Sequence, residues 1–500
     1  MLASELLSQA AARASGKAAV VGVDRTIGYA ELEVIADRFG ASLAGAGIAR
    51  GAFVGVLSRN CPEYAALHFG AARAGVIPAH MSVRSTSEEV ATVLAQTKAR
   101  LLFHDDASSA TAQAACEAAG HEVDRVVLVG GLDEFLEPSV LDVNFPRLSA
   151  DDPLCVTYSG GTTGAPKGVL VSHGSRCGMA NAIARSFDLS PDDVTCAVTP
   201  LFHVAGLLVW LQPAISIGAT CVLQRVWNPV EFMELAERFE ISAVMMVPTQ
   251  LIDLLNHEKF SPERLKSLRR IVHAGAPIPA AVIAQASETL PWIEFVENYG
   301  QSELGSVTVR RAADLPAKAG SVGRAIGGVE VCVMSTGGAV AAPGDPGELC
   351  VRGPGVLTEY LGASRETEEL YRYGDGWVAT GDIARMDEDG FVTLVDRARD
   401  VIISGGANIY PTEIENVIYR IPGVEECAVF AIPDSRLGEV PAAHVVFRAK
   451  TVPLERDILE FCMARLGAHK VPRVVELVDA LPKTAVGKVR KNVLRDQYRE

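Results

Sequence analysis

A glycine-rich stretch between two apolar runs constrains the fold of this 500-residue chain more than any other feature. Residues 154–158 (Leu-Cys-Val-Thr-Tyr) are typical of a buried strand, and residues 169–171 (Val-Leu-Val) are typical of a second one. The stretch between them is rich in glycine and hydroxyl side chains: Ser159, Gly160, Gly161, Thr162, Thr163, Gly164, Ala165, Pro166, Lys167 and Gly168. Because glycine has no Cβ and tolerates positive φ, the N–H and O–H groups of such a loop can close around a polyanion. We therefore predict a loop that binds nucleotide phosphates between two strands.

The loop differs from a Walker A loop. That motif needs Gly-Lys-Ser/Thr running into a helix, whereas here Pro166 precedes Lys167 and a strand is predicted next. A P-loop NTPase is therefore disfavoured. A surface turn without a ligand stays the alternative for this stretch taken alone.

Six further segments extend the pattern along the chain. They are residues 201–206, 274–277, 298–303, 377–382, 396–400 together with Glu415, and 482–488. With the loop, they resemble the motifs of the adenylate-forming superfamily and occur in that family's order. This superfamily contains acyl- and aryl-CoA synthetases, luciferases and the adenylation domains of peptide synthetases. One such motif would be weak evidence, but the whole series in order makes coincidence negligible.

Composition sets the class of protein and excludes some partners. With 49% hydrophobic and 21% charged residues, the chain can bury large cores and is expected to divide into more than one domain. A net charge of −15 and a pI near 5.3 argue against a nucleic-acid partner. The ten cysteines show no CxxC and no regular spacing, so we expect reduced thiols in a cytosolic protein.

Targeting signals are not evident in the sequence. The N-terminus lacks the pattern of a signal peptide, the apolar stretch 204–217 is interrupted by Gly206, Gln212 and Pro213, and the last residues are no peroxisomal address. We therefore expect a cytoplasmic protein without a membrane span.

Helical and strand patterns alternate through most of the chain. A first βα series occupies residues 26–150 and a second one residues 154–316, so each is expected to form a mostly parallel sheet covered by helices. The glycines at 45, 47 and 51 imitate part of a dinucleotide fingerprint, but they close a helix and are interpreted as C-caps. Beyond Gly320, short β runs among Gly and Pro suggest a small β-barrel lobe. The prediction is an α/β fold: a large N-terminal domain, 1–396, and a small mobile α+β C-terminal domain, 397–500.

The resemblance implies ligands for ATP and Mg²⁺. Ser159 to Gly164 and Lys167 would form the phosphate loop, although the family often has Ser where this chain has Gly160. Glu303 would hold Mg²⁺ with help from the hydroxyl of Ser159, since hard cations prefer oxygen ligands. A solvated glutamate is the alternative for Glu303.

Further residues would bind the rest of the nucleotide. Those expected around adenine and the phosphates are Gly275, Ala276, Pro277, Asn298, Tyr299, Gly300, Gln301 and Ser302. The small residues at 275–277 would admit a flat ring. Asp382 would accept both ribose hydroxyls with its two oxygens, supported by Arg397, and the alternative for Asp382 is a capping role.

The acid would lie against an apolar wall. By resemblance His203, Val204, Trp210 and Tyr299 line its pocket, and a core histidine is the alternative for His203. The neighbours of His203 carry no charge, so an apolar acyl tail is expected. Dicarboxylates are disfavoured because the strip 270–279 places no arginine for a second carboxylate, with Arg269 and Arg270 near enough to leave this open.

The C-terminal domain would supply the moving parts. Arg399 stands where the family commonly has the Asp or Lys hinge. Gly405 and Gly406 would leave room for the pantetheine of CoA. Lys488 is the expected catalytic lysine, with a solvated cation as its alternative.

The predicted function is an AMP-forming acyl-CoA synthetase of fatty or aromatic acid metabolism. It would act on a medium-chain, alicyclic or aromatic monocarboxylate with ATP, Mg²⁺ and CoA. Loading of a carrier-protein thiol and a non-catalytic nucleotide-binding regulator are the rivals, and a homodimer is left open.

Removal of the Lys488 ammonium should separate the two half-reactions. The ammonium offsets charge that builds only in the transition state of adenylation, so Lys488→Ala should lower that rate more than substrate affinity. Given acid and ATP, the variant should scarcely release pyrophosphate. Given a synthetic acyl-adenylate and CoA, it should still form thioester. Comparable loss in both assays would make Lys488 structural, and Lys483→Ala controls for loss of charge.

Overall fold

The computed structural model describes residues 1–136, 145–159, 167–276, 278–335, 337–448, 454–483 and 489–498. Within these residues the chain forms two compact units. The first unit comprises 1–159, 167–330 and 351–378, and the second comprises 331–350 and the chain from 379 onward. The predicted domain boundary at 397 stays a prediction.

A seven-stranded sheet carries the first βα series. Its order is β18 (Glu359–Tyr360), β8 (Lys167–Ser172), β7 (Pro153–Ser159), β4 (Ile77–His80), β3 (Phe53–Leu57), β5 (Leu101–His104) and β6 (Asp124–Val127). The strands from β7 to β6 are parallel, while β8 is antiparallel to both β7 and β18. The predicted parallel sheet is therefore confirmed, with an antiparallel edge.

A nine-stranded sheet carries the second series. Its order is β15 (Arg324–Ala325), β14 (Gly305–Arg310), β13 (Glu294–Gln301), β12 (Arg270–Ala274), β11 (Ala243–Met246), β9 (Val194–Ala197), β10 (Thr220–Leu223), β1 (Ala18–Val21) and β2 (Thr26–Gly28). The strands from β13 to β1 are parallel. Each of the two sheets therefore has most of its strand carboxyl ends along one of its own edges.

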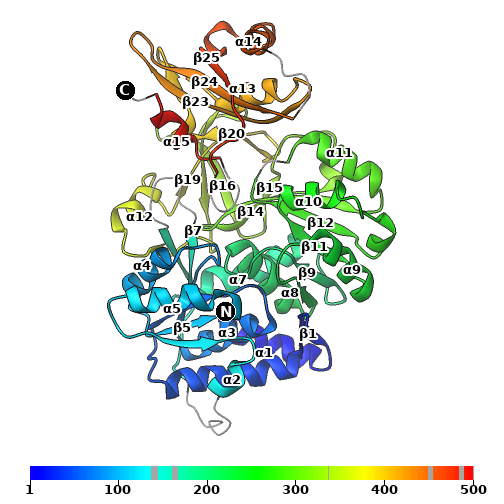
Figure 1. Ribbon diagram of the computed structural model, residues 1–500, viewed down its shortest axis with the longest axis vertical. Helices are drawn as coiled ribbons and strands as arrows, with labels where there is room; N and C mark the ends of the chain where they lie inside the picture. Colours follow the sequence, from blue (N-terminus) through cyan, green and yellow to red (C-terminus); the bar gives the residue numbers. More distant parts are fainter. Residues whose placement is uncertain are drawn as a thin grey trace. The chain divides into compact units, whose positions relative to one another are not determined.

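Helices cover both sheets of the first unit in layers. The seven-stranded sheet packs α4 (Ser87–Thr97) and α5 (Ser109–Ala118) on one face. The other face shares a core with the nine-stranded sheet, filled by α1 (Ala3–Ala14), α2 (Tyr29–Gly45), α3 (Pro62–Ala74), α7 (His173–Ser186), the π-helix at Ala205–Leu211 and α8 (Gln212–Ile217). The outer face of the nine-stranded sheet packs α9 (Pro229–Phe239), α10 (Pro248–Leu255) and α11 (Ala280–Thr289), in green in Figure 1.

Local chemistry explains where helices begin and end. In α9 the Asn228 side chain accepts hydrogen bonds from the backbone N–H groups of Val230 and Glu231, at 2.9 and 3.0 Å, and Pro229 occupies the first helical position. At the end of α2, Gly47 has a φ of +70° and donates its N–H to the carbonyl of Ala44. The interpretation of this glycine as a C-cap is thus confirmed.

The second unit is built on two further sheets. Where the sequence suggested a barrel-like lobe, a four-stranded sheet has the order β16 (Glu330–Met334), β17 (Gly347–Arg352), β19 (Val378–Met386) and β20 (Val392–Arg397). A five-stranded sheet follows with β22 (Ala407–Ile409), β21 (Ile402–Ser404), β24 (Gly438–Phe447), β23 (Val424–Asp434) and, beside β24, β25 (Val474–Leu477). Helices α13 (Pro411–Ile418) and α14 (Glu455–Met463) pack on it in one core, and α15 (Lys491–Asp496) contributes to another. This is the predicted α+β arrangement.

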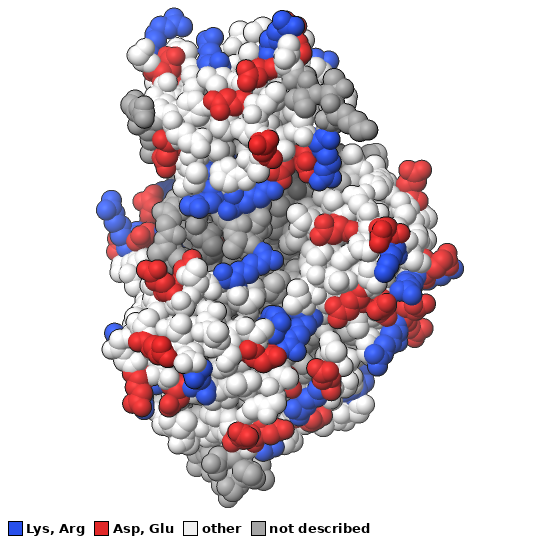
Figure 2. Space-filling view, in the orientation of Figure 1, with Lys and Arg blue, Asp and Glu red and all other residues white. Residues whose placement is uncertain are grey.

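Surface and thiol chemistry follow the composition. On the face shown in Figure 2, acidic and basic side chains are interspersed over the first unit, and no basic stripe appears among the described residues there. None of the described helices is both long and apolar enough to cross a bilayer. The ten cysteines form no disulfide with one another, and all but Cys116 are buried.

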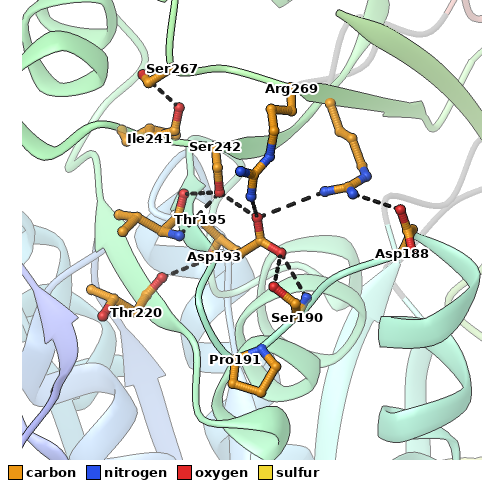
Figure 3. A network of polar contacts seen from close by, with 12 residues as sticks. Asp188, Ser190, Pro191, Asp193, Thr195, Thr220, Ile241, Ser242, Ser267 and Arg269 are labelled. Atoms are coloured by element: carbon orange, nitrogen blue, oxygen red, sulfur yellow. Dashed lines mark hydrogen bonds and ion pairs between the residues drawn. The ribbon is translucent and has the colours of Figure 1, made fainter.

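A buried carboxylate ties together the amino ends of three strands (Figure 3). The side chain of Asp193 is 1% exposed and accepts hydrogen bonds from Arg269 at 2.7 Å and from the Ser242 hydroxyl at 2.6 Å. Its other oxygen accepts from the backbone N–H and hydroxyl of Ser190. Burial raises the pKa of the Asp193 carboxyl, but the hydrogen bonds outweigh burial and hold that pKa below its usual value.

Asp193→Asn should destabilise the fold at neutral pH. The substitution leaves buried donors without their charged partner, which typically costs about 1–3 kcal/mol. Since the folded-state pKa lies below the unfolded value of about 3.9, this stabilisation is present above that value and lost as pH falls through the folded pKa. Urea unfolding should therefore show a difference from wild type at pH 7 that shrinks towards pH 3.

Asp188→Asn is the matched control. The Asp188 side chain is 60% exposed and pairs with Arg270 at 2.6 Å, so its loss should cost about 1 kcal/mol or less. Equal effects of the two substitutions would contradict the importance of the buried carboxylate.

Candidate active site

The predicted phosphate loop is closed by an antiparallel pair of strands. Ser159, the last residue of β7, is the register partner of Lys167, the first residue of β8. The strand, loop, strand order is therefore confirmed, and the chain enters no helix directly after the lysine, unlike a Walker A loop. The loop residues 160–166, which include the predicted Gly160, Gly161, Thr162, Thr163 and Gly164, lie outside the described residues.

Glu303 lies in the tight turn of the β13–β14 hairpin. Gln301 is paired with Gly305 and Gly300 with Ser306, which leaves residues 302–304 as the turn. Two glycines make this turn feasible: a Cβ on Gly300 would lie 2.0 Å from the Gly305 carbonyl oxygen, and Gly305 itself has a φ of +69°. The hairpin thus presents the Glu303 carboxylate at the end of β13.

A buried arginine donates a hydrogen bond to the backbone of this turn. Arg176, on α7, is 3% exposed and donates from Nη2 to the carbonyl of Ser302 at 2.6 Å. Burial lowers the pKa of the Arg176 guanidinium to about 10, and the nearby Glu303 carboxylate opposes that shift. Sequence reasoning missed Arg176. Its signal was a lone arginine at helical spacing (i, i+4, i+7) with Ala180 and Ile183, which are both buried.

A tyrosine that the sequence did not single out contacts the same carboxylate. Tyr360, on β18, donates its hydroxyl to Glu303 Oε1 at 2.7 Å. The Lys167 ammonium lies 5.1 Å from the centroid of the Tyr360 ring. Burial, with the Glu303 carboxylate second, raises the pKa of Tyr360 above its usual value, so the phenol stays protonated and donates. Three distant segments thus bring a carboxylate and an ammonium together around one ring.

The chemistry of Glu303 fits a magnesium ion that also binds nucleotide. Magnesium is usually held by one or two carboxylates together with substrate phosphates and water. Among the residues that the structure describes, no group of three or more His, Cys, Asp or Glu could hold a metal by itself. A single carboxylate in reach of a phosphate loop therefore suits a metal that arrives with ATP.

The predicted adenine strip is open to a ligand. Gly275 and Ala276 follow the carboxyl end of β12 and are exposed, with a Gly275 φ of +90°. On the neighbouring strand β13, Asn298 and Tyr299 are buried, and Asn298 accepts a hydrogen bond from the Ser306 hydroxyl. Pro277 lies outside the described residues.

The predicted ribose residues lie together in the second unit. Asp382, on β19, is the register partner of Arg397 on β20, and Arg397 Nε lies 2.8 Å from Asp382 Oδ1. The Asp382 side chain is 5% exposed, whereas that of Arg397 is 43% exposed. Gly381, the residue before Asp382 in β19, has a φ of +72° and donates its N–H to Glu348 Oε1 at 3.0 Å. The pair can present carboxylate oxygens and a guanidinium to a sugar.

The predicted acyl-pocket segment follows strand β9. His203 is half-buried, and its Nδ1 accepts the backbone N–H of Ala205 at 3.3 Å. Val204 is buried. Trp210 is fully buried on the π-helix, with its ring centroid 6.0 Å from that of Phe187. The roles of His203, Val204 and Trp210 towards an acid stay predictions.

The two arginines near the adenine strip are engaged elsewhere. Arg269 binds Asp193, and Arg270 binds Asp188. Both arginines lie at the amino end of β12, and Arg270 is four residue steps along the strand from Ala274, roughly 13 Å. They therefore do not reach the carboxyl end, where the candidate ligands lie.

Part of the C-terminal machinery is described. Gly405 and Gly406 form the two-residue turn between β21 and β22, with φ values of +56° and +83° that suit glycine. Arg399 lies in a short 3-10 helix, and burial lowers its pKa. Lys488 lies outside the described residues, while the nearby Lys483 forms an ion pair with Glu426. The hinge and CoA assignments stay predictions.

Taken together, the fold and the order of these segments along the chain are those of a class of AMP-forming ligases. The chain belongs to the family of AMP-binding enzymes: the model of the AMP-binding enzyme matches residues 7–361, and the model of the AMP-binding enzyme C-terminal domain matches residues 413–488. It is an AMP-forming acid–thiol ligase.

Individual relatives support this classification. Feruloyl-CoA synthase from Amycolatopsis sp is 35% identical over 473 residues, which cover 94% of each chain. The crystal structure of ATP-bound MatB from Rhodopseudomonas palustris has a TM-score of 0.91 at 27% identity and covers 100% of this chain and 99% of that one. O-succinylbenzoate coenzyme A synthetase (MenE) from Bacillus subtilis, in complex with ATP and magnesium ion, has a TM-score of 0.86 at 26% identity, with 99% of each chain covered.

Gly305→Ala should disturb the Glu303 turn. A Cβ there would lie 2.4 Å from Nη1 of the buried Arg176, in addition to the left-handed φ. We expect kcat for adenylation to fall about tenfold or more, because an ångström-scale displacement of a catalytic group has effects of this order. The rate of pyrophosphate release at saturating acid and ATP measures this kcat.

Gly320→Ala provides the comparison. Gly320 has a φ of +86° but no atom within 4 Å of an added Cβ. The Gly320→Ala variant therefore has only the backbone penalty of a left-handed φ, roughly 1–2 kcal/mol, and no steric clash. A similar loss of kcat in both variants would mean that Arg176 does not constrain the turn.

Proposed function

We propose that the chain is an AMP-forming acyl-CoA synthetase that activates an aromatic, alicyclic or medium-chain monocarboxylate. The observation that carries the adenylation chemistry is the grouping of Glu303 and Lys167 around Tyr360. A carboxylate for a metal and an ammonium for a phosphate, both in contact with one tyrosine, suit the nucleotide end of such a reaction. Mg²⁺ would neutralise phosphate charge there, and CoA would be the second substrate.

The reaction has two steps in this proposal. A carboxylate oxygen of the acid forms a bond to the α-phosphorus of ATP while the bond to pyrophosphate breaks. The thiolate of CoA then forms a bond to the acyl carbon while AMP leaves with the electrons of the broken C–O bond. Lys167 and the loop would hold the phosphates, Asp382 with Arg397 would orient the ribose, and Lys488 would stabilise the charge that develops during adenylation.

The substrate class rests on charge and on similarity. Arg269 and Arg270 are bound to Asp193 and Asp188 at the far end of their strand, so they offer no partner to a second carboxylate. An unpaired charge in an apolar pocket is costly to bury. The relative named for feruloyl-CoA makes aromatic acids the first class to test.

Compartment and transfer partner belong to the same proposal. Ten cysteines without a disulfide among them suit the cytoplasm. Arg399 would be the hinge about which the C-terminal residues turn between the half-reactions, and Gly405 and Gly406 would face pantetheine after that turn.

A panel of acids tests the function. With ATP, Mg²⁺ and CoA, we expect pyrophosphate release with ferulate, phenylacetate and octanoate. For malonate and succinate, kcat/KM should be at least about tenfold lower, because the second carboxylate is buried without a partner. A tenfold loss corresponds to about 1.4 kcal/mol in activation free energy. Mass spectrometry of the products should show acyl-CoA.

Two outcomes would contradict the proposal. Preferred turnover of a dicarboxylate would overturn the substrate class. Accumulation of acyl-adenylate without acyl-CoA would favour the carrier-protein alternative instead.

A further inference from the structure

The hydroxyl of Tyr360 occupies one of the two oxygens of Glu303. The Oη–Oε1 distance is 2.7 Å, which is that of a strong hydrogen bond to a carboxylate. Tyr360 is 9% exposed, and a phenol is protonated at neutral pH, so its hydroxyl donates to the carboxylate. A carboxylate whose Oε1 is held in this way keeps its second oxygen for another ligand.

The backbone around Glu303 and Tyr360 is joined at further points. The N–H of Leu357 donates to the Glu303 carbonyl at 2.6 Å, and the N–H of Leu361 donates to the Gly168 carbonyl at 2.8 Å. Tyr360 is itself the register partner of Val169 on β8. The segment 357–361 therefore bridges the hairpin that carries Glu303 and the strand that begins at Lys167.

The Tyr360 ring also meets the cation that follows the phosphate loop. Lys167 Nζ lies 5.1 Å from the ring centroid, within the range in which an aromatic face attracts an ammonium. One side chain thus contacts both a proposed metal ligand and a proposed phosphate ligand. Its hydroxyl serves the first contact and its ring the second, so the two contacts can be removed separately.

We propose that Tyr360 is a positioning residue that orients Glu303 for the metal of the metal–ATP complex. This inference rests on the proposed function, since it takes Glu303 as the magnesium ligand. The Tyr360 hydroxyl holds Oε1 and leaves Oε2 for the ion. Partners that orient a metal-binding carboxylate in this way commonly account for about 10–100-fold in metal affinity or activity.

Tyr360→Phe tests the proposal, because it removes the hydroxyl and keeps the ring beneath Lys167. Binding of Mn²⁺ as a spectroscopic substitute for Mg²⁺ is measured by electron paramagnetic resonance with a non-hydrolysable ATP analogue, so the readout does not require turnover. We expect the Kd for the metal to rise about 10-fold or more. In steady-state assays the half-saturating Mg²⁺ concentration should rise likewise, excess Mg²⁺ should restore the rate, and the KM for the acid should stay unchanged.

Tyr371→Phe is the matched control. The Tyr371 hydroxyl donates to the Leu357 carbonyl at 3.3 Å, in the same segment but away from the carboxylate of Glu303. This variant should bind the metal as the wild type does. Thermal unfolding of both variants is followed alongside, so a general loss of stability would be seen as such.

A double-mutant cycle decides whether Tyr360 acts through Glu303. Glu303→Gln should itself weaken metal binding, and adding Tyr360→Phe should then change the Kd by less than about twofold if both residues act through one oxygen. Wild-type metal affinity in Tyr360→Phe, or full additivity in the double variant, would overturn the proposal. If the wild type binds metal–ATP as expected but releases pyrophosphate with no acid, the proposed function fails while the role of Tyr360 can still be measured.

Discussion

The site depends on one constraint, which is that parallel strands have their carboxyl ends at the same edge of a sheet. This holds within each sheet of the first unit: β7 ends at the phosphate loop in the seven-stranded sheet, whereas in the nine-stranded sheet β9 precedes the His203 segment, β12 ends just before Gly275 and β13 leads to Glu303. The segment 357–361 joins the two sheets, through the N–H of Leu357 to the Glu303 carbonyl and the pairing of β18 with β8. The amino ends carry different chemistry: there Asp193 binds Arg269 and Ser242. Charged groups that stabilise the sheet are thus separated by the length of the strands from groups that are available to a ligand.

The Glu303 turn shows how the fold holds a charged group at the site. Arg176 is buried below the turn and Tyr360 lies beside it, so the carboxylate lies close to a cation and accepts a strong hydrogen bond. Gly300 and Gly305 allow the strands to approach closely enough for this packing. Burial lowers the pKa of Arg176 to about 10, which still leaves the guanidinium charged at neutral pH. Preorganisation of this kind lowers the cost of ordering the site when ligand binds.

Long, periodic elements were predictable because their signals are local. The helices Pro62–Ala74 and Pro229–Phe239 show such local signals, since each begins with proline at its first position and buries apolar side chains. The glycine loop was predictable for the same reason, as strand, glycines and strand are adjacent in the chain. Strand β18 was not, because two residues become a strand only through pairing with β8.

The sequence by itself determined the α/β class, the strand, loop, strand order around 159–167, the turn glycines and the family, because each depends on residues close together in the chain or on motifs in a recognisable order. Only the tertiary structure decided that Arg269 and Arg270 serve Asp193 and Asp188, and that Arg176 and Tyr360 serve the Glu303 turn. In the sequence, Tyr360 lies 57 residues from Glu303 and Arg176 lies 127 residues from it. No local periodicity encodes such a contact, since it follows from which strands become neighbours when the sheets form.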